Sequence, residues 1–130
     1  MSVSFQIDHQ DPTPIHAQLE RAIRFAIATE RLRAGDQLPT VRQLAVDLRI
    51  NANTVARVYA ELERDRVVET RRGVGTFVRA RRFEAATRRD RERRLRQAAD
   101  RFLAEVGLLG FSLDEVIAHL ASRRDKGELP

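Results

Sequence analysis

Apolar side chains recur at helical spacing over residues 15–62, where they fall into three groups. The first group follows Pro14, which suits the first turn of a helix because its nitrogen has no hydrogen to leave unpaired. This group predicts a helix over about residues 14–31 that stops near Gly35. The second and third groups follow the spacing i, i+3, i+4, i+7 and predict two shorter amphipathic helices. The apolar positions are Ile15, Leu19, Ile23 and Ile27; Val41, Leu44, Ala45 and Leu48; and Val55, Val58, Tyr59 and Leu62.

Polar residues that cap helices stand before the second and third of these helices. Thr40 and Gln43 have the spacing of a capping box, in which each side chain bonds the backbone N–H of the other residue. Asn51 is a favourable N-cap for the third helix. Only about three or four residues separate the two helices, which is the geometry of a helix-turn-helix.

After Asp65 the pattern changes to two short runs rich in β-branched residues around a pair of glycines. Val67–Arg71 and Thr76–Val78 predict two strands, and residues 72–75 predict the turn between them. Three helices followed by such a hairpin form a winged helix-turn-helix.

Beyond Arg79 the pattern is helical again, with no helix breaker before Gly107, where we expect the helix to end. Ser112 and Glu115 form a second capping box, which predicts the start of a last helix. A single pair of amphipathic helices cannot bury both of its apolar faces alone. We therefore expect a second copy of the chain to cover them, and the alternative is packing against the chain's own winged domain. The expected dimerisation residues are Leu95, Phe102, Val106, Leu113, Val116, Ile117 and Leu120.

These elements together predict a mostly α-helical chain with a small β-hairpin wing. We expect a winged helix-turn-helix DNA-binding domain over residues 1–79 and a two-helix C-terminal dimerisation segment over residues 80–130. A chain of 130 residues suits one modest domain with such an appendage, and it is too short for two full domains.

Composition excludes several classes of protein. The chain has no cysteine, which excludes disulfides, thiolate metal sites and a cysteine nucleophile. No apolar run approaches the roughly 18 residues of a membrane span, and the first residues do not resemble a secretory signal, so we expect a cytoplasmic protein. His9, His16 and His119 are scattered, and no Ser-His-Asp grouping or nucleotide-binding glycine loop is present. We therefore expect no metal, no cofactor and no enzymatic activity.

The net charge of +5 favours an anionic partner. Lys126 is the only lysine among the 24 basic residues. Arginine is the better bidentate ligand of phosphate and guanine, although a GC-rich genome produces the same bias. Residues 79–96 hold nine arginines and three acids, a net charge of +6, whereas residues 1–78 carry only +1. The arginines of residues 79–96 either add phosphate contacts beside the wing or form a solvated helix face.

Candidate DNA contacts cluster at the starts of the second and third helices and at the tip of the hairpin. Asn and Arg side chains pair with adenine and guanine edges, and a recognition helix enters the major groove by its N-terminal end. A hydroxyl and a guanidinium at a helix start bind phosphate, and arginine beside glycine suits the minor groove. The alternative is that Asn51 and Thr54 only cap a helix and that the arginines are solvated. The candidates are Thr40 and Arg42; Asn51, Asn53, Thr54 and Arg57; and Arg71, Arg72, Gly73 and Gly75.

Three stretches, residues 35–45, 51–59 and 72–78, resemble the GntR family of bacterial transcription regulators. The opening Pro14-Ile15-His16-Ala17-Gln18-Leu19 and the Asn-x-Asn-Thr-Val start of the third helix are most similar to its YtrA subfamily. The resemblance implies a winged helix-turn-helix that binds a double-stranded DNA operator as a homodimer. It assigns DNA contacts to Thr40, Arg42, Asn53, Thr54, Arg57, Gly73 and Gly75.

We therefore expect a repressor that binds a palindromic operator. One alternative is a protein-interaction module that keeps the winged fold without binding specific DNA, and another is a general binder of RNA or DNA. Four arginines on the expected DNA side favour DNA over the first alternative: Arg42, Arg57, Arg71 and Arg72. The sequence names no small-molecule effector.

Overall fold

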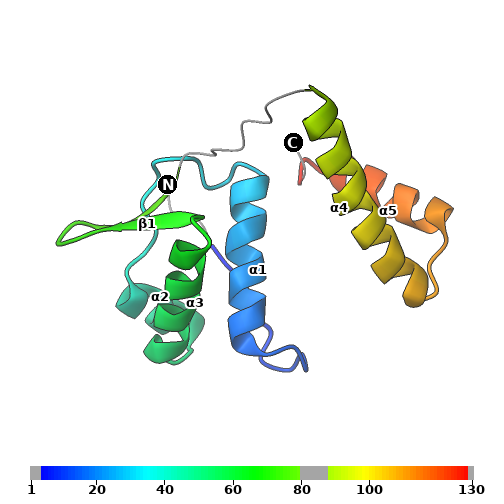
Figure 1. Ribbon diagram of the computed structural model, residues 1–130. Coiled ribbons are helices and arrows are strands. Elements are labelled where there is room, and N and C mark those ends of the chain that lie inside the picture. Colours follow the sequence, from blue (N-terminus) through cyan, green and yellow to red (C-terminus); the bar gives the residue numbers. More distant parts are fainter. Residues whose placement is uncertain (1–3, 80–87, 129–130) are drawn as a thin grey trace. The chain divides into compact units, whose positions relative to one another are not determined.

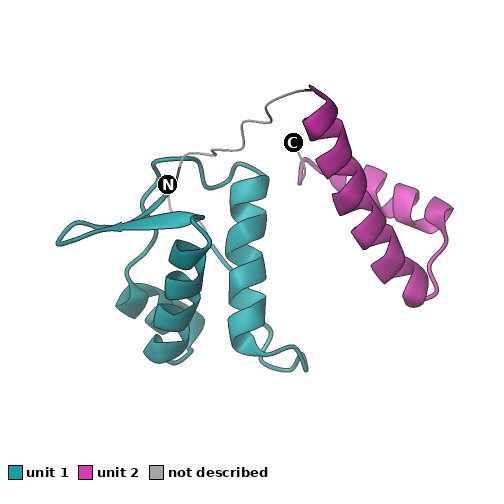
Figure 2. Ribbon diagram, viewed as in Figure 1, with its two compact units in different colours: residues 1–81 teal, residues 82–130 magenta. Residues whose placement is uncertain are grey.

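The structure is a computed structural model that describes residues 4–79 and 88–128 (Figure 1). The chain divides into two compact units, residues 1–81 and residues 82–130 (Figure 2). The predicted boundary after residue 79 adjoins residues 80–87, which lie outside the described residues, and the assignment of separate functions to two domains stays a prediction. The described elements are α1 (Ile15–Ala28), α2 (Val41–Leu48), α3 (Ala52–Arg64), β1 (Val68–Arg71), β2 (Gly75–Val78), α4 (Arg88–Leu108) and α5 (Leu113–Asp125).

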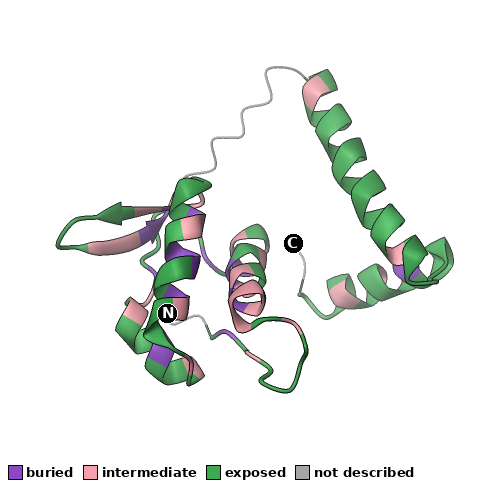
Figure 3. Cartoon of the chain, turned by 60° about the horizontal axis from the view of Figure 1, so that its bottom comes forward, coloured by how far each residue is buried: buried purple, intermediate pink, exposed green. Residues whose placement is uncertain are grey.

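These elements confirm the predicted fold class, a mostly helical chain with a winged helix-turn-helix and a small hairpin. Helix α3 is central to the first unit, because it contacts α1, α2 and β1. Its buried side chains are the four that the spacing predicts, Val55, Val58, Tyr59 and Leu62. Burying one such side chain contributes about 1.5–3 kcal/mol, so this stripe determines which face of α3 stays exposed. Figure 3 shows the buried residues of the first unit on the inner sides of its helices.

The connection between α2 and α3 has the predicted length, residues 49–51. Thr40 and Gln43 form the predicted capping box at the start of α2, with both hydrogen bonds at 3.1 Å. At the other end, Arg49 adopts a left-handed conformation (φ 56°) that ends α2 and lets the chain turn into α3. This turn confirms the helix-turn-helix.

Helix α1 is shorter than predicted, since it ends at Ala28 and not near Arg31. Glu30 takes a positive φ of 59°, which turns the chain out of the helix. The turn allows the N–H of Leu32 to donate to the carbonyl of Ala26 at 3.0 Å and buries the Leu32 side chain in the core. The gain from burying this leucine offsets the cost of the left-handed residue.

Helix α4 does not end at Gly107, as the sequence suggested, but passes through it to Leu108. The glycine that ends the helix is Gly110, whose φ is 91°. Its conformation lets the N–H of Phe111 donate to the carbonyl of Val106 at 3.1 Å. Gly107 is tolerated because a glycine inside a helix costs only about 1 kcal/mol.

The wing has a third strand-like segment that the sequence pattern did not predict. Strands β1 and β2 pair antiparallel, with Val68 opposite Val78. On the other edge of β2, residues 35–38 run antiparallel to it: Leu38 N–H donates to the carbonyl of Thr76, and Gly35 N–H donates to that of Val78, both at 2.8 Å. A segment this short shows no alternation of apolar and polar residues, so the pattern indicated only a turn.

Tyr59 joins α3 to the residue before the α2 cap. Its ring is buried, and its hydroxyl donates to the carbonyl of Pro39 at 2.7 Å. Burial raises the pKa of the Tyr59 hydroxyl, which therefore stays protonated as a donor. A Tyr59→Phe variant should lose about 1–2 kcal/mol in the free energy of unfolding, because the carbonyl of Pro39 loses its partner. Urea unfolding followed by circular dichroism measures this loss, and an unchanged midpoint would contradict the assigned role.

The second unit buries much less of its apolar surface than the first. Among residues 88–128, Val116 is the only buried residue, and α4 buries none. Ser112 and Glu115 form the predicted second capping box at the start of α5. Figure 3 shows both helices of this unit exposed along most of their length. None of the helices in the described ranges is long and apolar enough to span a lipid bilayer.

Candidate nucleic-acid interface

The start of α2 presents groups that bind anions. Thr40 uses its Oγ1 atom to accept a hydrogen bond from the N–H of Gln43, so its hydroxyl hydrogen can still donate outward. Arg42 is exposed in the first turn of the helix. The unpaired N–H groups and the helix dipole add partial positive charge at the same end. These groups together suit a DNA phosphate.

The outward face of α3 carries Asn53 and Arg57, both exposed, while Thr54 lies half-buried at its edge. The Arg57 Nε atom donates to a carboxylate oxygen of Glu61 at 3.3 Å, and the Arg57 side chain keeps 62% of its surface exposed. An exposed pair of this kind contributes little stability. Arg57 can therefore exchange Glu61 for a guanine edge at little cost.

Asn51, the residue before α3, has the N-cap role that the sequence predicts, and Arg64 at the end of the helix is a further exposed arginine. Asn51 acts as the N-cap, because its Oδ1 atom accepts from the N–H of Asn53 at 2.8 Å. Its side-chain nitrogen is left as a donor. Arg64, seven residues after Arg57, is exposed on the same side of the helix. Arg64 is not among the predicted DNA contacts, which come from the first turns of α3, although the helical period places it on the same side as Arg57.

The arginines of the wing occupy two different environments. The Arg71 guanidinium lies over the ring of Phe77, 4.3 Å from its centroid, and pairs with Glu69 at 3.0 Å. Arg71 is thus held against one face of the hairpin, with 54% of its side chain exposed. Arg72 is exposed at the tip, followed by Gly73 with open space around it and by the exposed Val74. Val74 is not among the predicted DNA contacts, although its exposed apolar side chain comes two residues after the candidate Arg72.

Gly75 has a structural reason to be glycine that the sequence did not reveal. Its φ is 147°, and a Cβ atom at this position would clash with the side-chain amide of Gln37. The Gln37 Nε2 atom donates to the carbonyl of Val74 at 3.2 Å. The open side of Gly75 is therefore occupied by the chain's own third segment.

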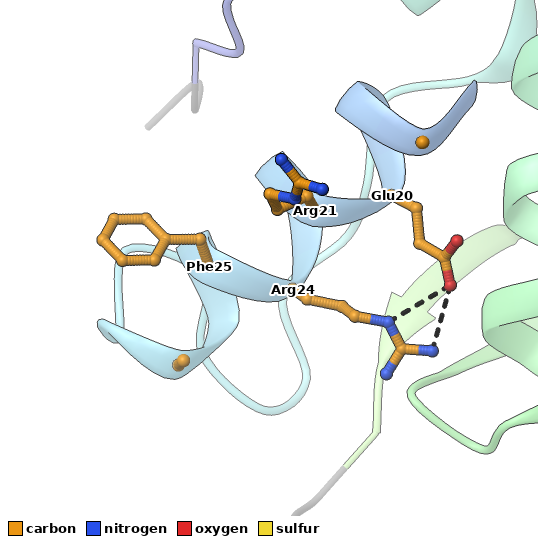
Figure 4. A pocket seen from close by; sticks show the side chains of 6 residues that line it. Glu20, Arg21, Arg24 and Phe25 are labelled. Carbon is orange, nitrogen blue, oxygen red and sulfur yellow. Dashed lines mark hydrogen bonds and ion pairs between the residues drawn. The ribbon is translucent and has the colours of Figure 1, made fainter. Parts of the chain in front are cut away.

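A shallow depression on α1 does not have the form of a ligand site (Figure 4). All of its lining residues belong to this one helix, so it is an open surface. Within it Arg24 pairs with Glu20 at 3.2 Å and with Asp65 at 2.7 Å. In the described parts of the chain, no three His, Asp or Glu side chains lie together as metal ligands would. The residues that line the depression are Ala17, Glu20, Arg21, Arg24, Phe25 and Ala28.

The predicted dimerisation residues form a partly exposed apolar surface on α4 and α5. Val116 differs from the rest, because it is buried in the single chain. Val106 is half-buried, and the other five are exposed, with fractions of 39% to 72%. Further exposed apolar side chains occur in the second half of α4 and in the turn before α5. These additional residues are Leu103, Leu108, Leu109 and Phe111.

The arginine-rich segment is described only from residue 88 onward, in the first turns of α4. Its six arginines between residues 88 and 96 are all exposed. Two of them pair within the helix, Arg88 with Glu92 and Arg93 with Asp90, each at 3.2 Å. This pairing is typical of a solvated helix face. A DNA contact by this segment stays a prediction.

Comparison with known proteins identifies relatives of the whole chain. The family described as "Bacterial regulatory proteins, gntR family" matches residues 15–78, from the start of α1 to the end of β2. The chain is 32% identical to "Uncharacterized HTH-type transcriptional regulator YhcF" of Bacillus subtilis, over 91% of this chain and 96% of that protein. It is 41% identical to "HTH-type transcriptional repressor YtrA" of the same species, over 56% of each protein. The structure of "GntR family transcriptional regulator from Listeria monocytogenes" is 30% identical, with a TM-score of 0.62 over 89% of this chain and 98% of that one.

Proposed function

Because the chain belongs to the GntR family of bacterial regulatory proteins, and is of the YtrA type, we propose that it is a repressor that binds a palindromic operator as a homodimer. Its family makes it a DNA-binding regulator and not an enzyme. The observation that carries sequence-specific binding is the outward face of α3, where Asn53 and Arg57 are exposed. Such a repressor acts in the cytoplasm, where bacterial DNA lies.

In this proposal the first turns of α3 read bases in the major groove. Arg57 donates to O6 and N7 of a guanine, and Asn53 pairs with an adenine edge. Thr40 and Arg42 bind a phosphate and set the position of α3 along the duplex. The wing tip, with Arg72, contacts the minor groove or the phosphates beside it. Each protomer thus reads bases with α3 and is positioned on the duplex by the start of α2 and by the wing tip.

The proposal of a homodimer is supported by the exposed apolar surface of the second unit. One buried valine is too little core for two helices, so water would cover most of their apolar side chains in an isolated chain. A second copy covers them in our proposal, with Phe102, Leu113 and Ile117 in the interface. Val116, which is already buried in the single chain, stays outside the interface in our proposal. Two-fold symmetry of the dimer then explains why the operator is palindromic.

Repression is proposed from the relationship with YtrA, whose name describes it as a repressor. A gel shift with the promoter DNA of the chain's own operon tests the proposal. The promoter duplex should be retarded at protein concentrations at which a scrambled duplex of equal length migrates freely. Equal retardation of the two duplexes would contradict sequence-specific binding and would support a general nucleic-acid binder.

Binding of the promoter duplex should weaken steeply with added salt, because each arginine–phosphate contact releases counterions. Arg42→Ala should weaken binding to every sequence equally and should reduce the slope of log K against log salt by about 1. Arg21→Ala, on the outer surface of α1, changes the net charge equally and is the matched control. A slope that falls by the same amount in both variants would contradict the phosphate contact of Arg42.

A further inference from the structure

One side chain of the third segment, that of Gln37, lies over the end of β2 near the tip of the wing. The register places Gln37 opposite Phe77 on β2, and Phe77 opposite Glu69 on β1. Residues two apart along a strand share a face, so Gly75 and Arg71 lie on the same face as these three. On this face the Arg71 guanidinium covers Phe77 from the β1 edge. The Gln37 amide covers Gly75 from the opposite edge and donates to the carbonyl of Val74 at 3.2 Å.

We propose that Gln37 is a positioning residue for the wing, which holds the tip in the conformation that presents Arg72 and Val74 to DNA. This inference rests on the proposed function of the wing as a DNA contact. Gln37 itself lies outside the groups that we assign to the phosphates and bases.

A hairpin of two four-residue strands needs such support at its tip. The base of the hairpin packs into the core through Val68 and Val78, whereas residues 71–74 at its tip are exposed. Beyond the last strand pair, Arg71 opposite Gly75, the tip is closed by one backbone bond, from Val74 N–H to the carbonyl of Arg71 at 2.9 Å. The bond from Gln37 Nε2 to the carbonyl of Val74 adds a second hydrogen bond to the tip, from a segment outside the hairpin. A tip that is ordered before binding loses less conformational entropy when it contacts DNA.

Gly75 and Gln37 depend on each other, because a Cβ atom at residue 75 would displace the Gln37 amide from its bond to the tip. Any side chain at residue 75 would occupy the space of the Gln37 amide, and it would also have to adopt a positive φ. An alanine at residue 37 would leave Gly75 uncovered and the tip without its second bond. The two substitutions should therefore be strongly non-additive, as for residues in direct contact.

The first test uses Gln37→Met, which keeps much of the side-chain volume over Gly75 but has no donor. Amide hydrogen exchange at Val74 in the free full-length protein should become about 2- to 10-fold faster, and affinity for the promoter duplex should fall by a similar factor. Gln6→Met, at an exposed residue outside the wing, is the matched control and should leave both unchanged. Unchanged exchange in Gln37→Met, or faster exchange without loss of affinity, would overturn the inference.

The second test uses Gly75→Ala alone and together with Gln37→Ala. The single Gly75→Ala variant should bind the promoter duplex about 10-fold or more weakly. The alanine must adopt a positive φ, and its Cβ atom displaces the Gln37 side-chain amide. In Gly75→Ala the new Cβ atom already displaces the Gln37 amide, so adding Gln37→Ala should cause little further loss of affinity. The Gln37→Ala single variant is measured as well. If the fold-loss of affinity in the double variant equals the product of the fold-losses in the two single variants, the residues act independently and the inference is overturned. Failure of the wild-type chain to prefer the promoter duplex would instead refute the proposed function itself.

Discussion

Replacing Arg57 with alanine should weaken operator binding by about 1–3 kcal/mol, roughly 5- to 150-fold, and relax the preference at one base pair. The reason lies in the position of the side chain. It projects from the face of α3 opposite the buried stripe, in the second turn, within reach of a groove that the helix enters by its N-terminal end. Fluorescence anisotropy with the operator and with single-base variants of it measures both effects.

The controls separate loss of base reading from loss of fold. The pair of Arg57 with Glu61 is exposed and contributes only about 0.3–0.5 kcal/mol, so the thermal midpoint should hardly change. Arg57→Lys keeps the charge but lacks the fork of donors that matches guanine, so it should retain non-specific binding and lose discrimination. If Arg57→Ala binds the operator with wild-type affinity and preference, the assignment of α3 as the recognition helix is wrong.

Phe102→Asp should convert the dimer into monomers and lower operator affinity by about 100-fold or more. The expected loss is large because a dimer binds the second half-site as an intramolecular event, which raises affinity by roughly 10²- to 10⁴-fold. Phe102 keeps 42% of its surface exposed in the single chain, and in our proposal the substitution places a charge where this exposed part meets the second copy. An unpaired charge buried at an interface is strongly unfavourable.

Sedimentation velocity measures the effect of Phe102→Asp on the oligomeric state. Gln97→Asp is the matched control, because Gln97 is exposed on the opposite side of α4 from Leu95 and Phe102. This control should remain dimeric. A Phe102→Asp protein that sediments as a dimer would contradict the proposed interface and favour packing of these faces elsewhere.

The helices of the first unit could be predicted because each signal is local. The spacing of Val55, Val58 and Leu62 determines which side of α3 is buried, and the residues left over define the exposed face. The capping box of Thr40 and Gln43 likewise depends on four consecutive residues. Periodicity and capping therefore suffice to predict the helix-turn-helix and the outward face of its second helix.

The details of the wing could not be predicted, because they depend on contacts between distant segments. The third segment pairs with a strand about 40 residues later, and nothing in its own composition indicates that pairing. The stacking of Arg71 on Phe77 and the cover of Gly75 by Gln37 follow only once the register is known. The sequence predicts that Gly75 allows a close approach to DNA, and the contact of Gly75 with Gln37 adds a constraint from within the fold.

The net charge of +5 indicates the class of partner, an anion, better than it indicates which residues bind that partner. Residues 1–78 carry almost balanced charge, yet they hold the exposed arginines of α2, α3 and the wing. The excess positive charge lies in residues 79–96, whose described arginines include two that pair with acids of the same helix. Placement of a few arginines on exposed helix starts thus supports DNA binding better than net charge does.

Selection of binding sites from a random duplex library with the full-length chain, followed by footprinting of the enriched site, tests the central claim most directly. The claim predicts an inverted repeat whose half-sites lie about 10–10.5 base pairs apart, or a multiple of that spacing, both protected at the same protein concentration. Two results would contradict the claim: equal binding to all duplexes with no sequence enriched, or no binding to any duplex. The first outcome would support a general nucleic-acid binder, and the second would support a winged-helix module for protein interaction.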